Sequence, residues 1–261
     1  MPLLGKQPRD AVVVRALAFG RPDGSLWAAG LDAGAAALIA GGTAEPLAAT
    51  VAWDADGSDW VLSGDAVSLT VAPIGEPSAV QDADRSDAGA ESQAAERAAP
   101  APPWSGRQER CRVSGTLAGT DLDATGVRTE LVDVDPAQLG SIRGFSGWLA
   151  DESLTLLALR AGGEHHHERD LVAATVFDAD RWRPSIDPRL STTYDRDGEP
   201  SRATLELWVV DGERELPRRA AGEATGPAAR LAADGMTIEV RPLRCHSRGS
   251  DGAGVYLLAS S

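Results

Sequence analysis

Short apolar runs, many of them rich in β-branched residues, follow one another along most of the chain and are separated by turn residues. Ala11–Phe19 (AVVVRALAF) is such a run, and Arg21-Pro22-Asp23-Gly24 has the chemistry of a turn, with Pro presetting φ and Gly accepting positive φ. Ser25–Leu31 then returns as a second run, which is a hairpin signal. Runs at a spacing of about 8–12 residues predict an antiparallel β-sandwich or β-barrel. No long helical pattern alternates with them, so a parallel α/β sheet is not expected.

The rest of the chain continues this pattern of predicted strands and shows almost no helix. After the first hairpin the predicted strands are 35–40, 47–54, 60–63, 66–72, 107–117, 127–134, 145–149, 154–159, 171–177, 190–194, 203–210, 215–222, 229–232, 236–244 and 254–259. Gly119–Gly126 is turn-rich, Asp135–Leu139 could form one helical turn, and Arg181–Pro184 carries loop signals.

One segment, Gly75–Pro103, interrupts this rhythm with Ala, Asp, Glu, Ser and Pro and no aromatic residue. Such a composition predicts a flexible acidic linker. The expected organisation is therefore an N-terminal β half at 1–74, the linker at 75–103, and a C-terminal β-barrel half at 104–261.

Charge and composition exclude several classes of protein. The net charge of −14 disfavours a nucleic-acid partner, because phosphate binding needs a basic surface. No run reaches the roughly 18 apolar residues of a spanning helix, and no signal peptide is recognisable, so a cytoplasmic protein without membrane insertion is expected. The two cysteines do not require a disulfide. The oligomeric state is left open.

The histidine cluster Glu164-His165-His166-His167-Glu168 holds three of the four histidines of the chain. His165 and His167 would share one face of a strand, which is an acceptable metal-ligand spacing. It resembles the His-x-His of cupins, although the glutamate that should follow is absent, and His246 could complete a three-histidine site. The alternatives are a solvated turn, or an acid/base role of these side chains at the rim of a pocket.

A second set of polar residues lies on the predicted strands 190–194 and 203–210. Glu206 shares a face with Trp208, and enclosure beside that ring would raise its pKa and suit it to donate a proton. Thr192, Tyr194 and Trp182 are expected to contact a ligand together with Trp208 and His167. The alternative is a half-exposed sheet with its polar residues outward. The candidate proton-transfer groups are Glu206, Glu164, Glu168 and Asp195.

Motifs for nucleotide or redox cofactors are missing. There is no phosphate-binding glycine loop, no Cys-x-x-Cys and no nucleophile elbow, since Gly144-Phe145-Ser146-Gly147 has the wrong spacing. Cys245 and His246 would face opposite sides of a strand. No cofactor is therefore expected.

Several C-terminal stretches resemble one known family. They are Asp187-Pro-Arg-Leu-Ser-Thr-Thr-Tyr194, the Asp197-Gly198 turn, Leu205-Glu-Leu-Trp208 and Gly252-Ala-Gly254-Val-Tyr256. Together they are similar to the lipocalin-like double-barrel group that includes AttH-like proteins and hydratases of the hydroxyneurosporene synthase type. The resemblance covers Ser105 to the C-terminus. It implies two packed lipocalin-like barrels and an apolar, isoprenoid-like ligand that a carboxylic acid hydrates or cyclises without a redox cofactor. No catalytic residue carries over by motif.

Three functions remain open on the sequence. The first is a cofactor-independent acid/base enzyme, a hydratase or cyclase, acting on an isoprenoid or terpenoid in a barrel pocket, in which Glu206→Gln should abolish turnover. The second is a non-catalytic protein that binds a similar small apolar ligand. The third is a cupin-like metalloenzyme that uses His165 and His167.

Overall fold

The computed structural model is entirely β-structured over the residues that it describes. These are 12–23, 26–32, 35–38, 47–53, 58–75, 77–79, 81–82, 105–135, 138–164, 170–178, 181–233 and 236–260. The strands form two antiparallel sheets, and no cis peptide bond occurs among these residues. None of the described segments forms a helix long and apolar enough to cross a membrane.

The first sheet closes into a barrel. Its strands are β1 (Val12–Gly20), β2 (Leu26–Asp32), β3 (Ala35–Leu38), β4 (Leu47–Trp53), β5 (Trp60–Gly64), β6 (Val67–Pro73), β7 (Ser78–Ala79), β9 (Ser105–Leu117) and β10 (Thr120–Val134). β6 pairs with β9, β9 with β10, and β10 returns to β1, so the ladder has no free edge between these strands. Closure of this kind satisfies the backbone groups that an edge strand would leave unpaired.

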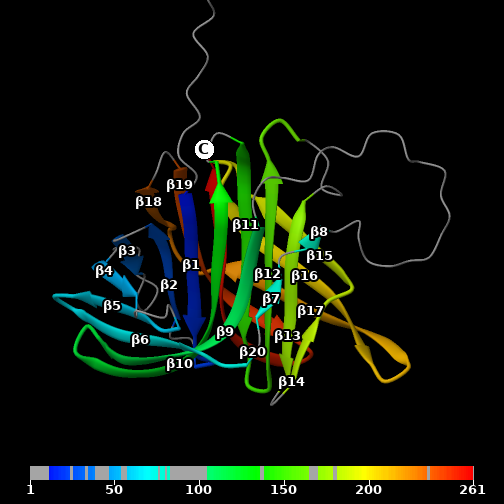
Figure 1. Ribbon diagram of the computed structural model, residues 1–261. Coiled ribbons are helices and arrows are strands. Elements are labelled where there is room, and N and C mark those ends of the chain that lie inside the picture. The colour runs from blue at the N-terminus through cyan, green and yellow to red at the C-terminus, as the bar shows by residue number, and fades with distance from the viewer. Residues whose placement is uncertain are drawn as a thin grey trace, which may run out of the picture.

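The second sheet forms the C-terminal barrel. Its strands are β8 (Gln81–Asp82), β11 (Leu139–Trp148), β12 (Glu152–Ala161), β13 (Leu171–Asp178), β14 (Arg181–Pro184), β15 (Asp187–Tyr194), β16 (Pro200–Asp211), β17 (Arg214–Ala224), β18 (Ala229–Ala233), β19 (Met236–Ser247) and β20 (Ser250–Ser260). The amides of Ser185 and Ile186 donate to carbonyls of Ala174 and Trp208 and so join β13 to β16. Figure 1 shows the two barrels side by side, with β1–β6 at the left and β15–β17 at the right.

Apolar and polar residues alternate along the strands, and the apolar side chains form three separate clusters. One lies inside the N-terminal barrel around Phe19, Leu62 and Val113, and one inside the C-terminal barrel around Leu205 and Tyr256. The third, which includes Leu131, Ile142, Leu157, Met236 and Ile238, lies between the barrels. On β12, for example, Leu154 and Leu156 belong to the barrel interior while Leu157 and Leu159 belong to the inter-barrel cluster. A strand buried on both faces reads as a continuous apolar run, and β12 has that sequence.

The boundary between the two sheets lies between Val134 and Leu139, further along the chain than the expected boundary at 104. β9 and β10 follow the linker in sequence but complete the first barrel by pairing with β6 and β1. The start of the predicted linker is also structured, because β7 pairs with β9 and β8 pairs with β13. The rest of the linker, 83–104, lies outside the described residues.

Three local predictions are corrected by the structure. The turn-rich stretch Gly119–Gly126 forms the first half of β10 apart from Gly119, with Leu122 and Ala124 buried and the acidic residues between them exposed. Arg181–Pro184 is the short strand β14 rather than a loop. β11 begins at Leu139, well before the predicted start at 145, and ends at Trp148. In each case a partner strand supplies backbone hydrogen bonds that the local sequence does not predict. The predicted turn at Asp135–Leu139 is confirmed, because the amides of Gln138 and Leu139 donate to the Asp135 carbonyl at 2.9 and 3.2 Å.

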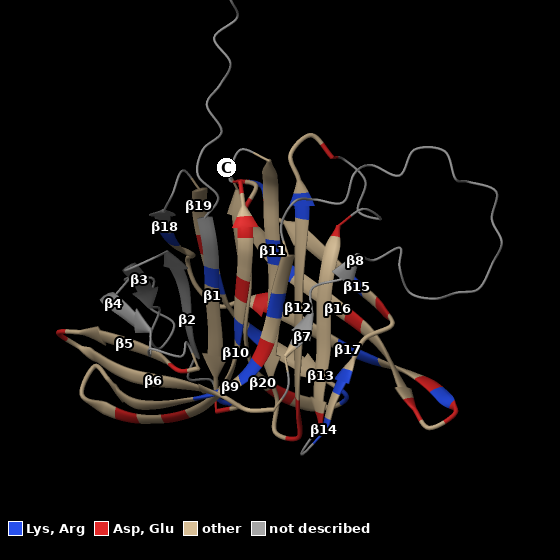
Figure 2. Cartoon of the chain, viewed as in Figure 1, with Lys and Arg blue, Asp and Glu red and all other residues tan. Residues whose placement is uncertain are grey.

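Charged side chains are distributed over both sheets. Figure 2 shows basic and acidic positions close together on the strands at the centre of the molecule, around β9, β10 and β11. Many of them are paired: Glu130 accepts from Arg15 at 2.7 Å, and the buried Arg128 donates to the buried Glu109. Arg128 also stacks over the Trp60 ring at 5.2 Å. The interior of the N-terminal barrel is thus partly ionic, and pairing offsets the cost of burying these charges.

Candidate functional site: a cleft between the two barrels

The structure separates the polar residues that the sequence suggested as one pocket. On β16 the residues Ala203, Leu205 and Leu207 are buried in the barrel, whereas Glu206 and Trp208 lie on the outer face. The half-exposed sheet with its polar residues outward is therefore the arrangement found here. Thr192 lies instead on the inner face of β15, where its hydroxyl contacts the hydroxyl oxygen of the buried Tyr256 at 3.1 Å.

The environment of Glu206 is the opposite of the one expected. Its carboxylate accepts hydrogen bonds from Arg219 and from Trp208 Nε1, the latter at 2.9 Å. These contacts, Arg219 foremost, lower the pKa of Glu206. The expectation of a raised pKa is wrong, because the Trp208 ring donates to the carboxylate instead of enclosing it. A lowered pKa leaves less of the protonated carboxyl group near neutral pH, so Glu206 is a poorer proton donor than expected.

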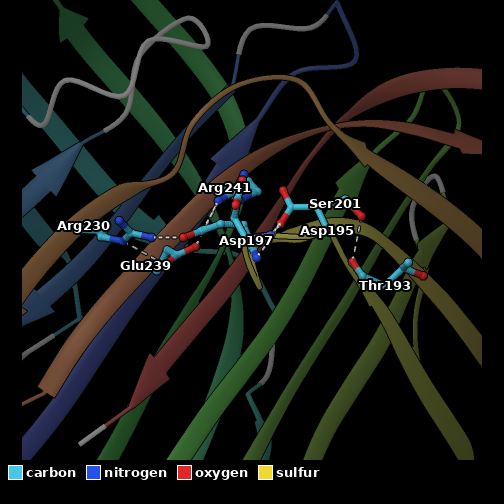
Figure 3. Close-up of polar contacts among 8 residues, drawn as sticks. Thr193, Asp195, Asp197, Ser201, Arg230, Glu239 and Arg241 are labelled. Atoms are coloured by element: carbon cyan, nitrogen blue, oxygen red, sulfur yellow. Dashed lines mark hydrogen bonds and ion pairs between the residues drawn. The ribbon is translucent and has the colours of Figure 1, made fainter.

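The side chain of Asp195 stabilises the β15–β16 turn. Its side chain accepts hydrogen bonds from the backbone amides of Asp197 and Glu199, both at 2.9 Å. Gly198 in the same turn has a φ of 81°, which glycine adopts without steric cost. Figure 3 shows Asp195 and Asp197 at this turn, beside the ion pairs of Arg230, Glu239 and Arg241. An exposed carboxylate used to close a turn is a poor choice for proton transfer.

The other sequence-nominated residues do not converge on one cavity. Trp182 and Tyr194 are exposed. Glu164 follows β12 and is half-buried, and His165, His166, His167 and Glu168 lie outside the described residues. Among the residues that are described, no group of three or more histidine, cysteine or carboxylate side chains could hold a metal ion. His246 is exposed, with Nδ1 at 2.9 Å from Asp251, while Cys245 is buried.

A cavity that the sequence did not suggest lies between the barrels. It has a volume of about 440 Å³, and its walls come from β9 and β10 on one side and from the β11–β12 turn and β13 on the other. Its lining residues are Gly20, Arg21, Pro22, Ile74, Arg110, Arg112, Asp123, Ala124, Thr125, Trp148, Leu149, Ala150, Asp151, Glu152, Ser153 and Phe177. We call this space the inter-barrel cleft. Its volume is within the range of small-molecule sites.

The apolar part of the inter-barrel cleft is preorganised. Trp148 and Phe177 are almost fully buried, so their rings are fixed by packing and present only an edge or a face to the cleft. Gly252 holds β20 close to Trp148, because a Cβ at this position would lie 2.0 Å from the Trp148 carbonyl oxygen. This close approach gives a physical reason for one glycine of the Gly252-Ala253-Gly254 motif.

Glu152 is the carboxylate that the fold positions most firmly in the inter-barrel cleft. It begins β12 after a tight turn in which the Leu149 amide donates to the Glu152 carbonyl at 2.9 Å. Its Oε1 accepts a hydrogen bond from Ser247 Oγ at 2.8 Å, and its Oε2 lies 3.6 Å from Arg218 Nε. Glu152 also lines a second cavity of about 270 Å³ that shares Leu149 and Asp151 with the cleft. Glu152 therefore lies at the border of both spaces.

Behind Glu152, ionic contacts hold Arg218 in place. Arg218 is largely buried and its Nη2 lies 3.8 Å from Asp178, which also pairs with Arg183. Arg183 in turn lies 3.4 Å from Asp211. This chain of alternating charges fixes the position of Arg218 and, through it, the orientation of the Glu152 carboxylate.

Comparison with solved structures identifies the fold. CghA in its complex with Sch210972 is 12% identical, with a TM-score of 0.59 over 95% of this chain and 88% of that chain. An AttH protein from Nitrosomonas europaea (NE1406) is 11% identical, with a TM-score of 0.54 over 98% of each chain. The fold is that of the AttH-like, lipocalin-type double barrel. At this level of identity the similarity establishes architecture alone. No family model and no curated protein sequence matches the chain.

Proposed function

We propose that the protein is an enzyme that binds a partly apolar small molecule in the inter-barrel cleft and hydrates or cyclises it by acid/base chemistry, with Glu152 exchanging the proton. The observation that carries the proposal is the position of Glu152. It lines a cleft of about 440 Å³, and both of its oxygens have positioning partners, Ser247 and Arg218. Proton transfer needs such a group within hydrogen-bonding reach of the substrate.

The lining of the inter-barrel cleft supports a ligand with both apolar and polar parts. Trp148, Leu149 and Phe177 offer apolar and aromatic surface, while arginines and carboxylates line the remainder. An isoprenoid or terpenoid body would fit the aromatic side, and π-faces there would stabilise a developing cation by about 0.5–2 kcal/mol each. The charged side fits a substrate that also carries a polar group better than it fits a pure hydrocarbon.

In hydration, a proton reaches one carbon of a C=C bond and the oxygen of water bonds to the other, so that the product gains one molecule of water. Glu152 would shuttle the proton between that water and the carbon. In cyclisation, the same carboxyl group would protonate one alkene, a second alkene would attack the cation formed, and loss of a proton would end the reaction without change of mass. Neither route requires a redox cofactor.

A non-catalytic binding protein is the second candidate, because the contacts of Glu152 with Ser247 and Arg218 would also suit a purely structural carboxylate. The test begins with native mass spectrometry of untagged protein and identification of the small molecule that denaturation releases. That molecule, and a panel of terpenoid alkenes and alcohols, is then returned to the protein in heavy-oxygen water and in deuterated water.

Incorporation of heavy oxygen would establish a hydratase. Incorporation of deuterium into an isomer of unchanged composition would establish a cyclase or isomerase. Saturable binding with an unchanged ligand would favour the binding protein. If nothing binds and Ser153→Trp, which fills the inter-barrel cleft, has no effect in any assay, the cleft is not the functional site.

A further inference from the structure

We infer that the ligand of the inter-barrel cleft carries an anionic group, such as a carboxylate or an enolate oxygen, which Arg110 binds. This inference rests on the proposed function for the location of the ligand and adds the chemical class of the ligand and its orientation. It is drawn from the pairing of arginines on β9, the contacts of Arg110, and the distribution of charge over the cleft walls.

Arg110 differs from its neighbours on β9 in having no acidic partner within the described ranges of the chain. Arg107 lies 3.2 Å from Glu130, and Arg112 donates two hydrogen bonds to Asp123 at 2.6 and 2.8 Å. No ion pair of Arg110 occurs among the described parts of the chain, although acidic residues outnumber basic ones by 39 to 25. In a protein so rich in carboxylates, an arginine without one at the wall of a cavity has unused capacity to bind an anion.

The contacts of Arg110 fix its guanidinium group at the inter-barrel cleft. The guanidinium carbon lies 5.3 Å from the centroid of the Phe177 ring on β13, so the group stacks between the two barrels. Its Nε is buried, and no residue that the structure describes forms a hydrogen bond with it. Stacking on an aromatic ring leaves the in-plane N–H groups directed sideways, where a planar oxyanion can accept two hydrogen bonds.

Further unused hydrogen-bonding capacity lies deeper between the barrels. Gln108 shares a face of β9 with Arg110, and Thr175 shares a face of β13 with Phe177, because alternate residues of a strand point the same way. Both side chains are buried, and Gln108 Oε1 and Thr175 Oγ1 have no hydrogen-bond partner among the residues that the structure describes. Buried polar atoms without partners are rare in folded proteins. Gln108 lines a smaller cavity between the barrels and its Oε1 only accepts hydrogen bonds, so it suits a hydroxyl group of the ligand and not the anionic group.

The opposite wall of the inter-barrel cleft has the opposite charge. Asp151 and Glu152 stand on the β11–β12 turn side, whereas Arg110 stands on the β9 side. An anionic group is repelled by the first wall and attracted by the second. The ligand therefore lies with its anionic end at Arg110, its apolar body against Trp148 and Phe177, and its reacting carbon toward Glu152.

The test uses two fluorescent probes with the same aromatic skeleton. Anilinonaphthalene sulfonate is anionic, and N-phenylnaphthylamine is its neutral counterpart. Dissociation constants of both are measured for the wild type and for Arg110→Gln, Arg110→Lys and Arg107→Gln. Arg107→Gln is the matched control, since Arg107 lies on the same strand and is paired with Glu130 but does not line the inter-barrel cleft.

Arg110→Gln should weaken binding of the anionic probe by about tenfold or more, as expected for loss of a charge-assisted hydrogen bond, and change that of the neutral probe by less than about twofold. Arg110→Lys should restore part of the loss, and Arg107→Gln should change neither dissociation constant. Retained binding of the neutral probe also shows that the variant is folded.

Equal weakening of both probes, or no weakening of either, would overturn the role of Arg110 and leave the inter-barrel cleft as the ligand site. Ser153→Trp separates this failure from failure of the proposed function. If this cleft-filling variant binds both probes as well as the wild type does, the probes bind elsewhere. The location of the site and the inference on Arg110 would then both be wrong.

Discussion

The interior of the C-terminal barrel and the inter-barrel cleft border the same strands but offer different physical environments. The interior is packed with Leu154, Leu205, Leu207, Tyr256 and their neighbours. The cleft holds about 440 Å³ of space between charged and aromatic walls. The difference teaches that, among the described residues, a space large enough for a small molecule lies where the two barrels meet, whereas apolar side chains fill the barrel interior.

Thiol reactivity should show the largest contrast between the two regions. Burial raises the pKa of Cys245, in the barrel interior, and of Cys111 to about 12. At pH 8 the thiolate fraction of such a group is on the order of 10⁻⁴, so neither native cysteine should react with a thiol reagent before the protein unfolds. Ser153→Cys places a third thiol in the inter-barrel cleft, and it should react at least about 10³-fold faster than the native pair.

The measurement is the number of labels added over time, read by mass spectrometry under native conditions. Rapid labelling of Cys245 in the wild type would mean that the barrel interior opens readily. The predicted difference in thiol reactivity between the two regions would then be wrong.

The two carboxylates Glu152 and Glu206 provide the next contrast. Glu152→Gln should lower turnover of the identified substrate by about 10²-fold or more, which is the usual contribution of a positioned proton-transfer group. Glu206→Gln removes an ion-paired carboxylate from the outer face of β16 and should leave turnover within about twofold. Steady-state kinetics and the pH profile of kcat distinguish the two variants. Equal losses in both, with unchanged stability, would return Glu206 to the catalytic role that the sequence suggested.

Truncation inside the barrel should cost stability and spare binding. Leu205 is fully buried on β16, and Leu205→Ala should lower the free energy of unfolding by about 2–5 kcal/mol. Val210→Ala, at an exposed position of the same strand, should cost less than about 0.5 kcal/mol. Urea unfolding measures both. Binding of the neutral probe should stay within about twofold for each, and a selective loss of binding in Leu205→Ala would show that the interior also holds ligand.

The smallest effect is expected on the outer surface. Because the folded-state pKa of Glu206 is lowered, chiefly by Arg219, the pair stabilises the protein above the unfolded pKa of about 4.3, and this contribution is lost as pH falls through the folded pKa. The stability difference between wild type and Glu206→Gln should thus be constant near neutral pH and shrink in acid. A difference that grows in acid would have the wrong sign for a lowered pKa.

The sequence by itself determined the class of fold. Alternation, turn chemistry and the absence of helical periodicity predicted an antiparallel all-β protein, and the resemblance of the C-terminal stretches predicted two lipocalin-like barrels; both are confirmed. These features are local, since an alternating strand or an Asp-Gly turn is written in consecutive residues. The faces of β16 could also be predicted from period-2 alternation, although which face is outward could not.

Only the tertiary structure decided which residues form the candidate site. Arg110 is far from Phe177 in sequence, and the two meet because β9 closes the first barrel and packs toward β13. Glu152 is likewise far from Ser247, and these two meet because β12 and β19 border the same barrel interior. No local pattern marks an arginine as lacking a carboxylate, because a partner can come from any strand of either sheet. The direction in which the pKa of Glu206 shifts could not be predicted for the same reason. The sequence shows Trp208 two residues away, but only the sheet register places Arg219 beside the carboxylate.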